Sequence, residues 1–155
     1  MKLIYTSDKV ELVGNSIFLA GPTPRSSKVP SWRPKAIEKL ASLNFPGTVL
    51  VPEGRNWVET LANFNFKDQV EWEWQGLENC SAIVFWVPRE IDTMPAFTTN
   101  VEFGSYVRSG RAYYGRPDNS EKNGYLDWLY KKTTGRDHFN NLDELLTYVV
   151  FLLER

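Results

Sequence analysis

Residues 82–87, Ala-Ile-Val-Phe-Trp-Val, decide the fold class of this chain. The run is apolar at every position and rich in β-branched and aromatic residues, which is typical of a strand buried on both faces of a parallel sheet. Residues 16–20, Ser-Ile-Phe-Leu-Ala, and residues 48–51, Thr-Val-Leu-Val, have the same character. The three runs therefore predict a parallel sheet with helices on both of its faces.

Stretches with helical patterns follow these runs, and their alternation with strands predicts right-handed βαβ units. We expect an α/β fold, a single-domain doubly wound parallel sheet in a three-layer sandwich, spanning residues 1–155. A fourth strand is expected near residues 111–114, and the first fifteen residues are interpreted as a loose hairpin. Helices are expected at about residues 34–44, 69–79, 98–110, 123–132 and 142–154.

Three of these helices carry more detailed expectations. The helix at 69–79 should place Val70, Trp74 and Leu77 on one face. The third helix should begin at a hydroxyl cap, Thr98 or Thr99. The C-terminal helix has a wide apolar surface, which should pack on the core or on another subunit.

Composition excludes several classes of function. The formal net charge is −1 and the basic residues are scattered, which argues against a polymeric nucleic-acid partner. Cys80 and His138 are the only residues of their types, so the sequence predicts neither a disulfide nor a zinc site, and the reducing cytoplasm is the expected location. No signal segment or membrane span is predicted.

Ligands of open parallel sheets bind beyond the carboxyl ends of the strands, so the residues after each apolar run are the informative ones. Residues 21–27, 52–57 and 88–95 form polar loops rich in proline at these places. The first is not a dinucleotide fingerprint, because its second and third glycines are absent, and a rigid turn is the alternative interpretation. The candidate substrate-binding residues are Gly21, Pro22, Thr23 and Arg25, with Trp57 or Trp32 as a platform for stacking a base.

Residues 98–104, Thr-Thr-Asn-Val-Glu-Phe-Gly, place Glu102 in the first turns of a helix beside the predicted cleft. Backbone amides and the helix dipole should favour its ionised form there. An ionised, positioned carboxylate can attack an anomeric carbon and form a covalent glycosyl intermediate. The alternative is that Glu102 only balances the helix dipole.

Together these elements resemble the nucleoside 2-deoxyribosyltransferase family and its nucleotide N-hydrolase relatives. The matching stretches are residues 17–22, 77–84 and 100–106 with Gly110. The resemblance implies a Rossmann-like or flavodoxin-like fold, a homo-oligomer, and a retaining mechanism through Glu102. The implied mechanism requires no metal or redox cofactor.

The resemblance also implies further site residues. Glu73 matches a second carboxylate that holds or protonates the base, with Glu71 as the next choice, and Asp92 matches a third. Asn100 belongs to the nucleophile's motif, and Asn123 matches a residue that completes a neighbouring subunit's site. The alternative for Glu73 and Glu71 is a solvated helix charge, and the alternative for Asn123 is a helix cap.

Phe18 stands where the family often has an aromatic hydroxyl, and a phenyl ring cannot orient a carboxylate by hydrogen bonding. This difference favours hydrolysis, or a divergent substrate, over base exchange. The sequence thus predicts an enzyme that transfers or hydrolyses the N-glycosidic bond of a small-molecule nucleoside or nucleotide. A nucleotide-binding or sensing module and an interaction protein are the alternatives.

Overall fold

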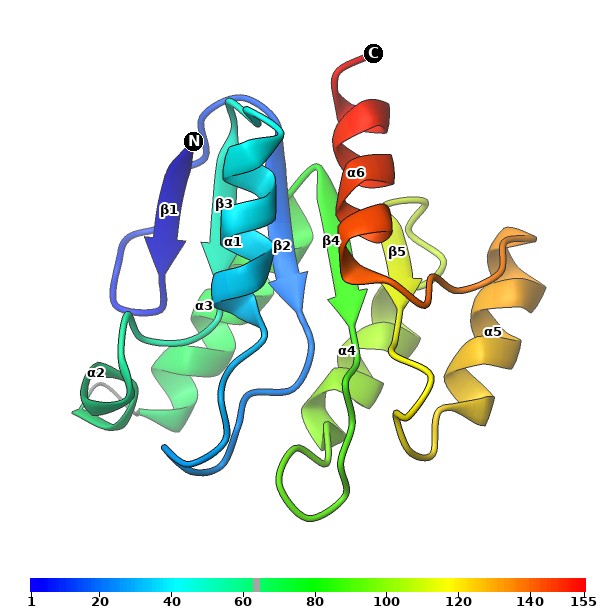
Figure 1. Ribbon diagram of the computed structural model, residues 1–155. Coiled ribbons are helices and arrows are strands. Elements are labelled where there is room, and N and C mark those ends of the chain that lie inside the picture. The colour runs from blue at the N-terminus through cyan, green and yellow to red at the C-terminus, as the bar shows by residue number, and fades with distance from the viewer. Residues whose placement is uncertain (63–64) are drawn as a thin grey trace.

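A computed structural model describes residues 1–62 and 65–155, and its centre is one sheet of five parallel strands (Figure 1). The strand order is β1-β3-β2-β4-β5, and each neighbouring pair is parallel. The strands are β1 (Lys2–Tyr5), β2 (Ser16–Ala20), β3 (Thr48–Val51), β4 (Ala82–Trp86) and β5 (Ala112–Gly115). The three runs predicted from the sequence are β2, β3 and β4, the central strands.

Helices cover both faces of the sheet, which confirms the doubly wound three-layer α/β fold. Figure 1 shows α1 and α6 in front of the sheet and α3, α4 and α5 behind it. The short α2 lies beyond the carboxyl end of the sheet (Figure 1). The helices are α1 (Arg33–Ser42), α2 (Trp57–Ala62), α3 (Phe66–Asn79), α4 (Phe97–Tyr106), α5 (Gly124–Thr134) and α6 (Leu142–Leu153).

Alternate residues of the central strands face the two helical layers, which explains why the strands are apolar apart from Ser16 and Thr48 at their first positions. On β2, Ile17 and Leu19 pack with α1 and α6, while Phe18 and Ala20 pack with the layer of α3, α4 and α5. All of these side chains are at most 1% exposed. The sheet therefore lies between two apolar clusters, one on each of its faces, and both exclude solvent.

The prediction of an N-terminal hairpin is wrong. Residues Lys2–Tyr5 form β1, which pairs in parallel with β3 at the edge of the sheet. Residues 9–13 form no strand against it. Because β1 runs parallel to the others, its following residue, Thr6, reaches the same end of the sheet as the loops after β2 and β3.

Helix α3 turns a different face to the sheet than predicted. Trp72, Gly76 and Leu77 are buried, whereas Val70 and Trp74 are 42% and 59% exposed. A Cβ atom at Gly76 would collide with the ring of Phe18, so this glycine lets α3 approach β2 closely. The rotation of α3 brings Glu73, next to the buried face, toward the end of the sheet.

Helix α4 begins and ends earlier than predicted. Its N-cap is Ala96, in the left-handed conformation with φ 60°, and no side chain caps it, so the expected hydroxyl cap at Thr98 or Thr99 is wrong. It ends at Tyr106, and Gly110 follows after a turn. Glu102 therefore lies in the second turn of α4.

Helix α6 packs on its own chain. Its apolar side chains at positions 145, 146, 149 and 150 are buried against the sheet and α1. The wide apolar surface noted in the sequence is thus part of the core. Within the described residues, no helix has the length and apolar character needed to cross a membrane.

Candidate functional site

A cavity of about 570 Å³ lies at the carboxyl ends of the strands. Here the chain reverses direction across the sheet, because β3 lies on one side of β2 and β4 on the other. The loops after β2 and β4 diverge, and such a switch point is where open α/β sheets bind ligands. The volume is within the usual range of small-molecule sites. The lining includes Thr6, Gly21, Pro22, Thr23, Arg25, Arg33, Pro52, Glu53, Gln69, Glu73, Phe97, Thr98, Thr99 and Glu102.

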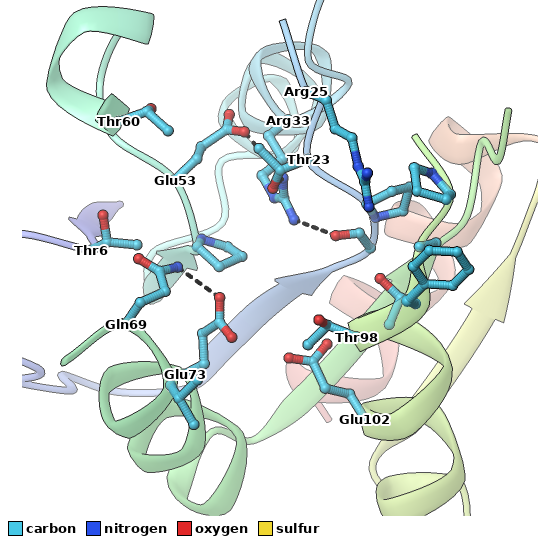
Figure 2. Close-up of a pocket in the computed structure, with 18 of the residues that line it drawn as sticks. Thr6, Thr23, Arg25, Arg33, Glu53, Thr60, Gln69, Glu73, Thr98 and Glu102 are labelled. Carbon is cyan, nitrogen blue, oxygen red and sulfur yellow. Dashed lines mark hydrogen bonds and ion pairs between the residues drawn. The ribbon is translucent and has the colours of Figure 1, made fainter. Parts of the chain in front are cut away.

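Two carboxyl groups enter this cavity from neighbouring helices (Figure 2). Glu73 lies on α3, one turn after Gln69, whose amide Nε2 donates to Glu73 Oε1 at 2.7 Å. Glu102 lies on α4, one turn after Thr98, while Phe103 of the same helix is buried in the core. Figure 2 shows both carboxyl groups pointing into the same space.

The environment raises the pKa of both groups. Burial, and then the negative charge of Glu73, raises the pKa of Glu102 to about 8. Burial is also the largest influence on Glu73, and it raises the pKa of that carboxyl above its ordinary value. The dipole of α4 was expected to favour ionised Glu102, and this expectation is wrong because desolvation and the second carboxyl outweigh it.

Two carboxyl groups with raised pKa values in one cavity hold a proton between them near neutral pH. The pair then offers one carboxylate and one carboxylic acid at the same time. These are the two groups that glycoside cleavage with retention requires, a nucleophile and a proton donor. Within the described residues, no group of three or more histidine, cysteine or acidic side chains is arranged to hold a metal ion.

The family model for nucleoside 2-deoxyribosyltransferase-like proteins matches residues 14–119, more than half of the chain. The chain belongs to the nucleoside 2-deoxyribosyltransferase-like family. A search of curated proteins found no match. The matched segment contains β2 to β5 and the cavity-lining residues from Gly21 to Glu102, so the region that defines the family includes the carboxyl pair.

The loop after β2 occupies the position expected for substrate binding in this deoxyribosyltransferase-like chain. Gly21, Pro22, Thr23 and Arg25 all line the cavity. Gly21 has φ 148°, and a Cβ atom there would collide with the carbonyl of Trp86, so only glycine fits. Arg25 is exposed, lies 5.8 Å from the centroid of the Phe97 ring, and bonds through its backbone N–H to the carbonyl of Thr93.

Four other candidates are not among the cavity-lining residues of this deoxyribosyltransferase-like fold. Asp92 is exposed in the turn between β4 and α4, and Trp57 begins α2. Asn100 accepts a hydrogen bond from the Arg89 guanidinium. Asn123 is 3% exposed and donates to the hydroxyl of Ser120 in its own chain.

Three aromatic or thiol side chains belong to the core of this family member. Phe18 is fully buried beside Trp72 and adds no polar atom to the cavity. Trp32 is 7% exposed and donates its indole N–H to the carbonyl of Pro22, so it supports the loop instead of stacking a base. Burial raises the pKa of the Cys80 thiol to about 11, which makes it a poor nucleophile.

Sequence reasoning did not single out Thr6, Arg33, Glu53, Thr60 and Gln69, which are polar residues of the cavity. Thr6 was hidden by the mistaken hairpin, and Gln69 by the rotation of α3. Arg33 could have been recognised from the sequence. A cation in the first turn of a helix is disfavoured by the helix dipole, which indicates that another group of the protein compensates its charge. Glu53 was part of a loop already assigned to the cleft.

The raised pKa of Glu102 predicts that Glu102→Gln stabilises the protein at alkaline pH. An unfolded glutamate ionises near pH 4.5, but the folded carboxyl has a pKa of about 8. The wild type therefore loses stability as pH rises from 4.5 to 8, and the loss is complete above 8. Glutamine has no proton to lose. The free energy of unfolding of the variant, relative to wild type, should therefore be higher at pH 9 than at pH 5 by on the order of a few kcal/mol.

Thermal unfolding at pH 5 and pH 9 measures this gain. Glu38→Gln is the matched control, because it removes the same group from the exposed face of α1. A difference in Tm between wild type and Glu102→Gln that stays constant across this range would contradict the raised pKa.

Proposed function

We propose that this protein cleaves the N-glycosidic bond of a nucleoside or nucleotide and passes the pentose through a covalent bond to Glu102. The observation that carries the proposal is the carboxyl pair, Glu73 and Glu102, inside a cavity of nucleoside size. Membership of the deoxyribosyltransferase-like family supports the same chemistry. In this proposal Glu102 is the nucleophile and Glu73 the acid.

The proton of the pair decides the order of events. In the free protein a pKa of about 8 keeps it mainly on Glu102, so substrate binding must move it to Glu73 before attack. The Glu102 carboxylate then forms a bond to the anomeric carbon while the bond to the base breaks. The electron pair of that bond goes to the base, which takes the proton from Glu73.

The second half of the reaction reverses these roles. Water or a second base attacks the anomeric carbon and releases Glu102 as a carboxylate. The Glu73 carboxylate accepts the proton of the incoming nucleophile, so the pair returns to its original charge. Atoms and charges therefore balance in both the hydrolysis and the transfer.

The direct test is chromatography of reactions with a panel of nucleosides and deoxynucleotides, each with and without a second free base. Free base, or an exchanged nucleoside, is the expected product. Arg25, an exposed cation in the cavity wall, and Phe97 and Phe66 at its mouth would meet the parts of the substrate away from the scissile bond. Binding without release of any base over hours would instead identify a nucleotide-binding module.

We expect hydrolysis to compete strongly with transfer. Transfer requires an intermediate that survives until a second base binds, so water must be excluded from the cavity. Phe18 supplies no hydroxyl to hold a carboxylate, and the cavity mouth is flanked by the exposed rings of Phe66 and Phe97. The measurement is the ratio of exchanged nucleoside to free sugar with excess base, and nearly complete exchange would contradict this prediction.

We also propose that the protein assembles as a homodimer through the layer of α3, α4 and α5. Large apolar side chains are exposed on all three helices, Trp74 on α3, Val101 on α4, and Tyr125 and Trp128 on α5. Gly104, with open space around its Cα atom, flattens the middle of this layer. A monomer rarely exposes so many large apolar groups on one face.

A two-fold axis parallel to α4 would place this face against the same face of a second copy, with α3 opposite the partner's α5. The exposed apolar side chains of both copies would then be buried against one another. Light scattering at micromolar concentration should show a dimer that Val101→Glu dissociates, and a wild-type monomer with full activity would contradict this.

A further inference from the structure

Arg33 is the most buried charged residue of the cavity wall, at 1% exposure. Its guanidinium donates through Nε to the carbonyl of Leu19 at 3.1 Å and through Nη2 to the carbonyl of Gly21 at 2.7 Å. Nη1 donates to Thr23 Oγ1 at 2.9 Å and to Glu53 Oε2 at 3.1 Å. One side chain thus ties the ends of β2 and β3 to the loop that borders the cavity (Figure 2).

Glu53 completes this arrangement from the far side of Arg33. Its carboxylate is 11% exposed and accepts hydrogen bonds from the Ser31 hydroxyl at 2.9 and 3.0 Å. Such a buried ion pair adds little to stability by itself, because desolvating both charges offsets their attraction. Net stability therefore does not explain this ion pair, and its position in the cavity wall indicates a role in the cavity.

The charged groups that line the cavity with Glu73 and Glu102 are Arg25, Arg33 and Glu53. The positive charge of Arg33 lowers the pKa of both carboxyl groups, against the upward effect of burial. Arg33 is thus a buried cation in the wall of the same cavity as the carboxyl pair, and its charge opposes the effect of burial on both groups.

We propose that Arg33, held by Glu53, is a positioning residue that supplies the counter-charge for the Glu73–Glu102 pair and keeps one of its two carboxyl groups ionised. This inference rests on the proposed function for its catalytic meaning, but the electrostatic relation holds whether or not the protein turns over substrate. Without Arg33, burial would leave both carboxyl groups protonated over a wider pH range, and the nucleophile would be scarce. Its bonds to Gly21 and Thr23 also fix the loop that faces the pair.

The test compares Glu53→Gln with the double variant Arg33→Met/Glu53→Gln, so that removing the cation never leaves a buried carboxylate alone. Carbon-13 NMR follows the titration of the Glu102 carboxyl without substrate. A unit charge at roughly 10 Å shifts a pKa by about one unit at an effective dielectric constant near 20. We expect the Glu102 midpoint of the double variant to lie higher than that of Glu53→Gln by a shift of this order, and equal midpoints would overturn the proposal.

Arg33→Lys keeps the inference testable if the double variant does not fold. Lysine retains the positive charge but loses the planar fork that donates to four oxygens at once. The Glu102 midpoint should stay near the wild-type value while KM for an active nucleoside rises about tenfold, the cost of one good hydrogen bond. A midpoint that moves upward by a full unit in Arg33→Lys would overturn the proposal. If the midpoints shift as expected but no nucleoside is cleaved, the proposed function fails and the electrostatic role stands.

Discussion

Glu102→Gln should lower the rate of base release by about 10,000-fold or more while the protein remains folded. Glutamine preserves the size of the side chain but cannot form a glycosyl ester, so the reaction loses its covalent route. A loss of that size corresponds to roughly 5 kcal/mol of barrier. Single-turnover measurement of free base with an active nucleoside, at pH 7, reports the chemical step directly.

Glu38→Gln is the control for this experiment, because Glu38 lies on the exposed face of α1, outside the cavity lining. It should retain the wild-type rate. Turnover by folded Glu102→Gln within tenfold of wild type would remove Glu102 from the mechanism.

Glu73→Gln should lower the rate by about 100- to 10,000-fold, the range typical of a lost general acid. The size of the loss should depend on the leaving base. A purine nucleoside methylated at N7 carries a positive charge on its base, which departs without needing a proton. With this substrate Glu73→Gln should recover most of the wild-type rate, whereas Glu102→Gln should not.

This contrast separates the acid from the nucleophile by measurement of two rates for each variant. Equal losses for both substrates in Glu73→Gln would show that Glu73 has another role, such as holding the sugar. Recovery of Glu102→Gln by the methylated substrate would show that no covalent step is needed.

The sheet could be predicted from the sequence because buried parallel strands leave a strong local signal. Apart from Ser16 and Thr48 at their first positions, the runs at β2, β3 and β4 are apolar throughout, and each is followed by a polar loop. The edge strand β1 lacks that signal, because it pairs on one side only and its residues are partly exposed. The sequence of this segment is equally compatible with a parallel edge strand and with one arm of a hairpin.

Glu102 could be located from its place in the sequence, but its environment could not. The helix dipole is a local property and predicts an ionised group. The raised pKa comes from burial and from Glu73, which is 29 positions earlier in the chain and on another helix. Only the packing of α3 and α4 on one sheet brings the two carboxyl groups together.

Arg33 illustrates the same limit in a different way. Three of its partners are oxygen atoms of Leu19, Gly21 and Thr23, two of them backbone carbonyls, and a sequence carries no mark of such contacts. Asp92 shows the reverse, since its motif position suggested a site residue and the structure places it in an exposed turn. For both residues, the position relative to the cavity depends on the tertiary structure and not on the local sequence.

The most direct test of a covalent glycosyl bond to Glu102 is mass spectrometry of the protein after incubation with a 2-fluoro-arabinosyl nucleoside. Fluorine at the carbon next to the anomeric centre withdraws electrons and disfavours the positively charged transition state, so the intermediate decays slowly. The predicted result is a mass increase of one fluorinated sugar, located by fragmentation on Glu102 and absent in Glu102→Gln. Release of base with no adduct, and with inversion at the anomeric carbon, would contradict the covalent mechanism.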